Sequence, residues 1–301
     1  MTLPKLAVFA SHMEAVTGDH GERLVEMARV IEAAGADQFV LSEHVVLARD
    51  IEAHGPGGGT FPFPSDHNYP EPMVTLAAVA GATERLRLAT GILIAPMRPA
   101  TLLAKMASTL DVLSAGRLDL GVGAGWHGPE LRSAGADPSD AMQRMDDIVG
   151  ACRALWAGGP SSYRSPTVNF DDLYCEPAPV SGAALPVWFA GPCIRSTFRR
   201  IVRLGDGWLP FGNVPLDGIA RGRAMLDQAA ADAGCDPAAF GIRASLPLDG
   251  ATAWARLNHA LAAAPDFVAA GANVLQLPLS RLATTLDEVH DVVATAAAAL
   301  A

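Results

Sequence analysis

Residues 116–130, Gly-Arg-Leu-Asp-Leu-Gly-Val-Gly-Ala-Gly-Trp-His-Gly-Pro-Glu, join a short apolar run to a burst of glycines. Leu118, Leu120 and Val122 are typical of a strand buried in a sheet, and the glycines suit a backbone that a large group approaches closely. Trp126 stands where a dinucleotide-binding fingerprint needs its third glycine, and the Gly-Lys-Ser/Thr ending of a P-loop is missing. We interpret the stretch as a strand that opens into a binding site. A purely structural glycine-rich turn is the alternative.

The rest of the chain repeats this order of strand and helix. Residues 33–41 end a helix, pass a glycine and enter an apolar run, and residues 269–277 repeat the same order. Eight strand–helix units predict an α/β fold, a (β/α)8 TIM barrel that forms a single domain over residues 1–301. The strands are expected near residues 6–10, 37–41, 86–94, 118–123, 186–190, 205–209, 240–246 and 273–277.

Two long stretches interrupt the repeat. Residues 45–70 contain three consecutive glycines and several prolines, and residues 158–185 carry no long helical stripe. Long loops in a compact barrel are often lids or binding loops, so we expect both stretches to lie over the barrel mouth, the second as an insertion between strands 4 and 5. A chain of two domains divided near Gly159 is the alternative.

Composition and charge argue against several classes of protein. The net charge is −10 and Lys and Arg form no run, so we expect no nucleic-acid partner. The apolar runs are too short for a signal peptide or a membrane span, which predicts a cytoplasmic protein with no membrane partner. The four cysteines form no Cys-x-x-Cys pair and are expected to be free thiols. No His-x-His or His-Glu-x-x-His motif is present, and we predict no metal site.

Functional groups of a TIM barrel gather at the carboxyl ends of its strands. The expected strand ends carry histidines, a glutamate, aromatic rings and glycines, which together suit a flat ring system. His44 as a hydrogen-bonded structural histidine is the alternative to a functional one. The residues at these ends are Ser11 and His12, Glu43 and His44, Gly91 and Ile92, Trp126 and His127, Gly191 and Phe211, with Gly123 and Gly125 just before Trp126.

A turn at residues 190–196 follows an expected strand and opens a helix. Its free backbone N–H groups and the positive end of the helix favour an anion such as phosphate. Arg144, early on the helix after the glycine stretch, is expected to reach such a phosphate, whereas pairing with a carboxylate one turn away is its alternative. The residues of the turn expected to bind the cofactor are Ala190, Gly191, Pro192 and Ser196.

Five segments, taken together, resemble the luciferase-like monooxygenase superfamily. They are residues 41–44, 88–92, 110–117, 121–126 and 206–210, and the most specific is the Asp-x-Leu-Ser-x-Gly-Arg segment that runs into Gly-Val-Gly. Within the superfamily the chain looks most like the branch that uses the deazaflavin coenzyme F420. That branch commonly has an aspartate where this chain has Glu43.

The resemblance implies a barrel with F420, or alternatively FMN, in its mouth. It implies a cis peptide bond between Gly91 and Ile92 behind the cofactor ring, and cofactor phosphate held by Arg144 and the turn at 190–196. His44 then faces the reactive part of the ring, and we expect it to act as the acid or base with Glu43 as its electrostatic partner. The residues expected to bind substrate are His12, Trp126, His127 and Phe211.

The leading hypothesis is an F420-dependent oxidoreductase that transfers a hydride between F420 and a small organic substrate. An FMN-dependent monooxygenase, a non-catalytic flavin-binding barrel and a metal-free barrel lyase or isomerase are the alternatives. Dimers are usual in families of this kind, so the resemblance also implies a homodimer.

Overall fold

Eight parallel strands close into a barrel in the computed structural model, which describes residues 3–19 and 21–301. Hydrogen bonds join the strands in the order β3-β2-β1-β11-β10-β9-β8-β5, and the pairing of β3 with β5 closes the ring. The predicted (β/α)8 fold is confirmed. The barrel strands are β1 (Lys5–Phe9), β2 (Gln38–Leu41), β3 (Arg87–Thr90), β5 (Leu118–Gly123), β8 (Val187–Gly191), β9 (Gly207–Pro210), β10 (Gly241–Ser245) and β11 (Val274–Pro278), and the short β4 (Leu93–Ile94) pairs with β5.

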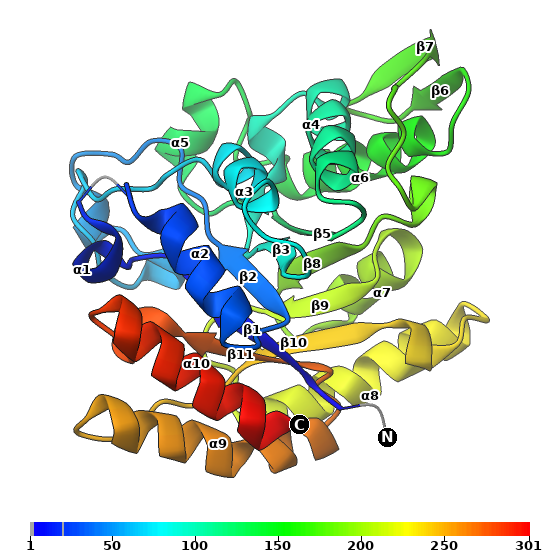
Figure 1. The fold of residues 1–301 in the computed structure, drawn as a ribbon. Coiled ribbons are helices and arrows are strands. Elements are labelled where there is room, and N and C mark those ends of the chain that lie inside the picture. The colour runs from blue at the N-terminus through cyan, green and yellow to red at the C-terminus, as the bar shows by residue number, and fades with distance from the viewer. Residues whose placement is uncertain (1–2, 20) are drawn as a thin grey trace.

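Helices cover the outside of the barrel, and α2, α10 and α9 pack side by side along one flank (Figure 1). The ends of α2 and α9 match the repeat seen in the sequence, because each is followed by a glycine in the left-handed region, Gly35 at φ 95° and Gly271 at φ 102°. The helices are α1 (Glu14–Thr17), α2 (Leu24–Ala33), α3 (Pro72–Ala80), α4 (Ala100–Leu113), α5 (Gly128–Ser133), α6 (Ala141–Trp156), α7 (Arg195–Leu204), α8 (Leu216–Asp232), α9 (Ala253–Ala269) and α10 (Leu286–Leu300).

One apolar cluster of the barrel interior packs small residues against the ring of Trp188. Alternate residues of a strand point to opposite faces, so every second side chain faces inward. The Trp188 ring occupies space that two neighbouring strands leave open, since a Cβ atom at Gly207 or Gly241 would lie 2.2 or 2.4 Å from it. Glycine is therefore needed at both positions to make room for the tryptophan.

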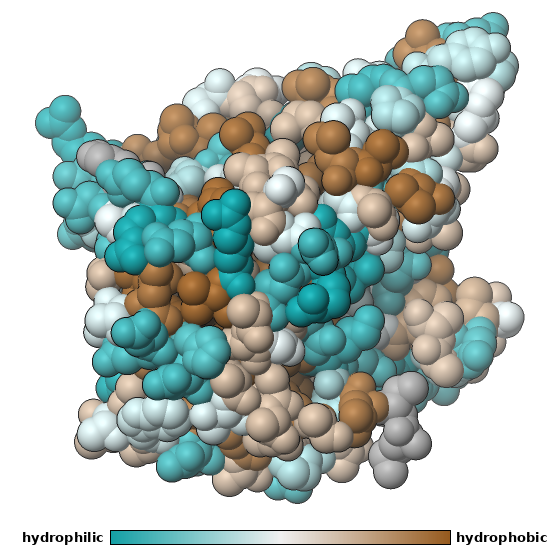
Figure 2. Space-filling view, in the orientation of Figure 1, coloured by the Kyte–Doolittle hydropathy of each residue, from teal (hydrophilic) through white to brown (hydrophobic). Residues whose placement is uncertain are grey.

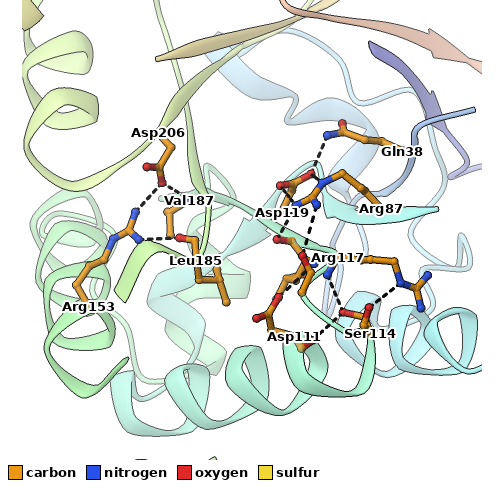
Figure 3. Close-up of polar contacts among 12 residues, drawn as sticks. Gln38, Arg87, Asp111, Ser114, Arg117, Asp119, Arg153, Leu185, Val187 and Asp206 are labelled. Carbon is orange, nitrogen blue, oxygen red and sulfur yellow. Dashed lines mark hydrogen bonds and ion pairs between the residues drawn. The ribbon is translucent and has the colours of Figure 1, made fainter. Parts of the chain in front are cut away.

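The sequence segment that carries the strongest family resemblance is structural (Figure 3). The Arg117 side chain donates to the carbonyl oxygens of Ser114 and Leu86 and to the hydroxyl of Thr83, at 2.6–2.9 Å. Asp119 accepts two hydrogen bonds of 2.7 Å from Arg87. These contacts lie where the strands begin, so they hold the barrel together at the end opposite its mouth.

A small hairpin forms the insertion between the fourth and fifth barrel strands. β6 (Ser161–Arg164) and β7 (Asn169–Leu173) pair in antiparallel fashion, and β5 pairs directly with β8 across the insertion. The expectation that this segment lies over the mouth is wrong. It follows α6, which runs back to the amino ends of the strands, and Val180 accordingly contacts Asp111 and Gly116 just before β5 begins.

Other sequence predictions concern the membrane and the cysteines. None of the helices that the structure describes is both long enough and apolar enough to cross a bilayer. All four cysteines are free thiols, as predicted.

Candidate active site

A cavity of about 400 Å³ opens at the carboxyl ends of the barrel strands. A smaller cavity of about 240 Å³ adjoins it and shares the lining residues Gly91, Ile92, Ala190 and Phe211. Mostly apolar concave sites of this size are typical of small-molecule and cofactor binding. Twelve of the predicted site residues line the larger cavity: His12, Glu43, His44, Gly91, Ile92, Gly123, Gly125, Trp126, Ala190, Gly191, Pro192 and Phe211.

The peptide bond between Gly91 and Ile92 is cis, as expected. The glycines around it are required by close contacts. A Cβ atom at Gly91 would lie 2.6 Å from the Val40 side chain, and one at Gly123 would lie 2.9 Å from Ile92. Gly123 therefore makes room for the Ile92 side chain. Ile92 lines the cavity between the end of β3 and the end of β5.

His44 follows the end of β2, and its ring lines the cavity. Its Nδ1 atom lies 2.8 Å from the Glu130 carboxylate, and the two side chains are only 10% and 1% exposed. A carboxylate can only accept, so Nδ1 carries the hydrogen, and Nε2 is the ring nitrogen left for chemistry in the cavity. The backbone N–H of Val45 also donates to Glu130, at 2.6 Å, which fixes the carboxylate in place.

Glu130 takes the place that the sequence analysis gave to Glu43. The Glu43 carboxylate is bound by Arg98, one contact being 3.0 Å, and by the backbone N–H of Ile94 at 2.7 Å. Burial raises the pKa of Glu43, while the Arg98 guanidinium opposes that shift. Both carboxylate oxygens of Glu43 are taken by these contacts, so Glu43 braces the strand ends, and His44 pairs with Glu130 instead.

Sequence reasoning missed Glu130 and Arg98. Glu130 is 86 positions from His44 and sits on α5, a helix that was not expected. A buried glutamate beside a histidine has no local sequence pattern. The signal available was the Gly-Pro-Glu that ends the glycine stretch, where proline marks the first turn of a helix.

Aromatic rings from the loop between β2 and α3 cover the His44 side of the cavity. The ring of His44 meets Phe61, Tyr69 and Trp126 edge to face, at centroid distances of 5.3, 5.1 and 5.7 Å. Such edge-to-face contacts are favourable for aromatic pairs. This part of residues 45–70 does lie over the mouth, as expected, although Phe61 and Tyr69 were not among the predicted site residues.

His12 lies just after the end of β1 and has a left-handed backbone, at φ 63°. Its Nδ1 atom is 2.8 Å from Nε2 of His67, and its ring stacks on Phe63 at 4.0 Å. Burial, with the charges of His67 and His44, lowers the pKa of His12 to about 3. His12 is therefore a neutral wall residue at physiological pH.

Three predicted residues lie off the cavity wall. His127 turns to the loop beyond β2, where its Nε2 accepts from the backbone N–H of Ala48 at 3.3 Å. Arg144 donates through Nε to the Pro96 carbonyl at 3.1 Å, and Ser196 is an exposed residue in the first turn of α7. The turn at 190–196 does open α7, and phosphate binding there stays a prediction.

A buried arginine was also missed. Arg243 comes from the middle of β10, is 6% exposed and lines the smaller cavity. Its Nη2 atom donates to the Thr90 carbonyl, 3.1 Å away, directly before the cis peptide. A single arginine inside an apolar strand gives no sign in the sequence that it faces the barrel interior.

The chain matches the family model described as luciferase-like monooxygenase over residues 3–296. It belongs to this family. The match covers all eight barrel strands and the residues that line the cavity.

Similar proteins include one solved with F420 and one solved with FMN. A Mycobacterium bovis protein without an assigned function is 32% identical over 195 residues, 64% of this chain and 69% of that protein. An F420-dependent secondary alcohol dehydrogenase, solved with an F420-acetone adduct, has the same fold at TM-score 0.77 and 15% identity, covering 100% of both chains. A Pseudomonas putida Baeyer–Villiger monooxygenase solved with FMN matches at TM-score 0.63 and 18% identity, covering 83% of this chain and 68% of that one.

Proposed function

We propose that this protein is an F420-dependent oxidoreductase that transfers a hydride between F420 and a small organic substrate. The observation that carries the proposal is His44, which lines the cavity with Nδ1 held 2.8 Å from Glu130. A histidine fixed in this way presents one nitrogen for proton exchange, and interconverting an alcohol and a carbonyl requires one proton for each hydride. The fold shared with an F420-dependent alcohol dehydrogenase supports the same choice.

The residues present fit a tricyclic ring. The cavity is open and mostly apolar, with Gly91 and Ile92 on one wall, and the adjoining cavity adds the polar side chain of Arg243. Ala190, Gly191 and Pro192 would hold the chain of the cofactor where β8 ends. Arg144 and Ser196 remain our candidates for its phosphate. F420, when bound there, supplies or accepts the hydride.

The protein supplies the proton and a dry site. His44 exchanges a proton with the substrate oxygen through Nε2, and Glu130 stabilises the imidazolium that forms, as carboxylates beside catalytic histidines do. Phe61, Tyr69 and Trp126 surround the His44 ring and exclude water from the substrate side. This aromatic wall suits a small apolar substrate, with His12 and Phe211 on the same cavity surface.

An FMN-dependent monooxygenase is the second candidate. The observation that favours it is the likeness to an FMN-bound monooxygenase, because the same barrel mouth accommodates either ring. A non-catalytic flavin-binding barrel is the third candidate. Such a protein would bind the cofactor and turn over no substrate.

The test is a parallel titration of the purified protein with F420 and with FMN, followed by turnover assays with a panel of small secondary alcohols. We expect F420 to bind more tightly and the His44→Ala variant to lose about 100-fold or more in turnover with its F420 affinity changed only a few-fold. Binding of FMN alone with consumption of oxygen would replace this proposal by the monooxygenase. Tight binding without turnover of any alcohol would favour the non-catalytic barrel.

We also propose a homodimer, as family resemblance implies. Figure 2 shows hydrophobic side chains gathered on the part of the surface where α3 and α4 lie, and Val74, Leu102 and Leu113 are exposed there. Exposed apolar patches often mark protein–protein contacts. Light scattering of the wild type and of a Leu113→Glu variant tests this, and a monomeric wild type contradicts it.

A further inference from the structure

Arg243 places a positive charge inside the barrel, directly below the cavity mouth. It faces inward from β10, between Ile242 and Ala244, which are fully buried on the outer side of the strand. Its Nη2 atom would lie 3.3 Å from a Cβ at Gly91, so the guanidinium packs against the backbone of the cis peptide. It therefore underlies the surface proposed to hold the cofactor ring.

The hydrogen-bonding capacity of Arg243 exceeds what the protein provides. A guanidinium has five N–H donors, and within residues 3–19 and 21–301 its one acceptor is the Thr90 carbonyl. No nitrogen of Arg243 is among the enclosed polar atoms that lack a partner, so its remaining N–H groups open toward the smaller cavity, where a bound group can accept from them. The other polar side chains of the smaller cavity are Ser245 and Gln276, which hydrogen-bond to each other at 3.0 Å.

Among the described residues, no carboxylate forms an ion pair with Arg243. Burial lowers the pKa of Arg243 to about 10, partly offset by Asp119, so the group stays protonated at neutral pH. The Asp119 carboxylate is already bound by Arg87 at 2.7 Å and by Gln38 at 2.7 Å. A buried cation without a dedicated anion favours an anionic or oxygen-rich group in the adjoining cavity.

We propose that Arg243, with Ser245 and Gln276, binds the carbonyl-bearing pyrimidinedione edge of the cofactor ring and favours the reduced ring over the oxidised one. The inference rests on the proposed binding of F420 or FMN, and it holds for either, because both rings carry this edge. Uptake of a hydride brings two electrons and one proton to the ring and adds one negative charge. A fixed cation beside the pyrimidinedione carbonyls stabilises that charge.

A purely structural role for Arg243 is the competing explanation. In that case the side chain only supports the Thr90 carbonyl, and its replacement lowers the stability of the fold without changing the relative affinities of the two redox states. The two explanations differ in a quantity that does not depend on turnover, namely the midpoint potential of the bound cofactor.

The experiment compares Arg243→Met and Arg243→Lys with the wild type and with Arg221→Met, a variant of an exposed arginine. Dissociation constants for oxidised and reduced cofactor, and the two-electron midpoint potential, are measured with whichever of F420 and FMN the wild type binds. We expect Arg243→Met to lose at least tenfold in its preference for the reduced form, a shift of about 30 mV to more negative potential. Arg243→Lys keeps most of the preference, and Arg221→Met keeps all of it.

A second variant covers the case in which Arg243→Met does not fold. Gln276→Glu keeps the size of the side chain and adds a negative charge to the same cavity, so it is expected to shift the potential in the same direction. An unchanged potential in a folded Arg243→Met or Gln276→Glu protein overturns the inference, even if the melting temperature falls. A wild type that binds neither cofactor would instead overturn the proposed function.

Discussion

The pairing of His44 with Glu130 makes a sharp prediction for the variant Glu130→Gln. One carboxylate oxygen accepts the backbone N–H of Val45, at 2.6 Å, and the other faces Nδ1 of His44. A glutamine has one oxygen, which the backbone N–H requires, so its NH2 group faces His44. Nδ1 must then accept, and the ring hydrogen moves to Nε2, the atom that should take the substrate proton.

The size of the effect follows from the distance and the burial. Two unit charges 2.8 Å apart attract by about 6 kcal/mol at an effective dielectric constant of about 20. The amide keeps a hydrogen bond and loses the charge, so we expect about 2–4 kcal/mol of catalysis to be lost, roughly a 30- to 1000-fold fall in turnover. Cofactor affinity should change little, because Glu130 is not part of the cavity wall.

Two assays check this prediction. Steady-state kinetics measure the fall in turnover, and nitrogen NMR of labelled histidine reports which ring nitrogen of His44 carries hydrogen, with no cofactor present. Glu84→Gln, which changes an exposed glutamate, is the matched control and should behave as the wild type. A Glu130→Gln protein that keeps the Nδ1 hydrogen and normal turnover would refute the assignment of Glu130 as the positioning residue.

Three further substitutions test the structure around the site. Replacing Arg98 with Met leaves Glu43 buried without its cation, so the free energy of unfolding at pH 7 should fall by about 3–5 kcal/mol in denaturant titrations. Burial already raises the pKa of Glu43, so this loss should shrink as the pH falls and the carboxyl is protonated, and an equal loss at pH 4 would contradict the assignment. Burial is the main reason that the pKa of His12 is lowered to about 3, below the value of about 6.5 in the unfolded chain. The stability contributed by neutral His12 is therefore fully present above pH 6.5 and is lost as the pH falls toward 3. His12→Asn should therefore flatten the fall of the melting temperature between pH 6.5 and 4, and an unchanged acid sensitivity would argue against this. Gly241→Ala puts a Cβ atom 2.4 Å from the Trp188 ring and should cost about 1–3 kcal/mol by overpacking, so an unaltered melting temperature would show that the barrel interior adjusts freely.

The fold could be predicted because its signals are local. Most strands contain a short apolar run, the long helices carry an apolar stripe, and Gly35 and Gly271 mark the same helix end in two places. The position of the insertion could not be predicted in the same way. Nothing in residues 158–185 indicates at which end of the barrel they lie. They lie at the amino ends of the strands because α6, the helix before them, runs antiparallel to the strands.

The site was predicted where its residues belong to strand ends and missed where they come from elsewhere. His44, Gly91 and Ile92 follow from the rule that barrel strands end at the mouth. Glu130 contacts His44 from 86 positions away in the sequence, and Arg98 contacts Glu43 from 55 positions away. Closure of the barrel brings these residues together. Long-range ion pairs of this kind have no period or spacing in the sequence.

The polar network around Arg117 and the proposed catalytic pair of His44 and Glu130 occupy opposite ends of this barrel, and Arg243 lies between them. Arg117 and Asp119 hold the amino ends of the strands together (Figure 3). His44 and Glu130 meet at the carboxyl ends. Arg243 supports the backbone at Thr90 and also lines the smaller cavity. Its replacement therefore affects both the fold and the cavity, and a change in stability alone carries no information on cofactor binding. Only the potential of the bound cofactor, measured on folded protein, separates the two effects.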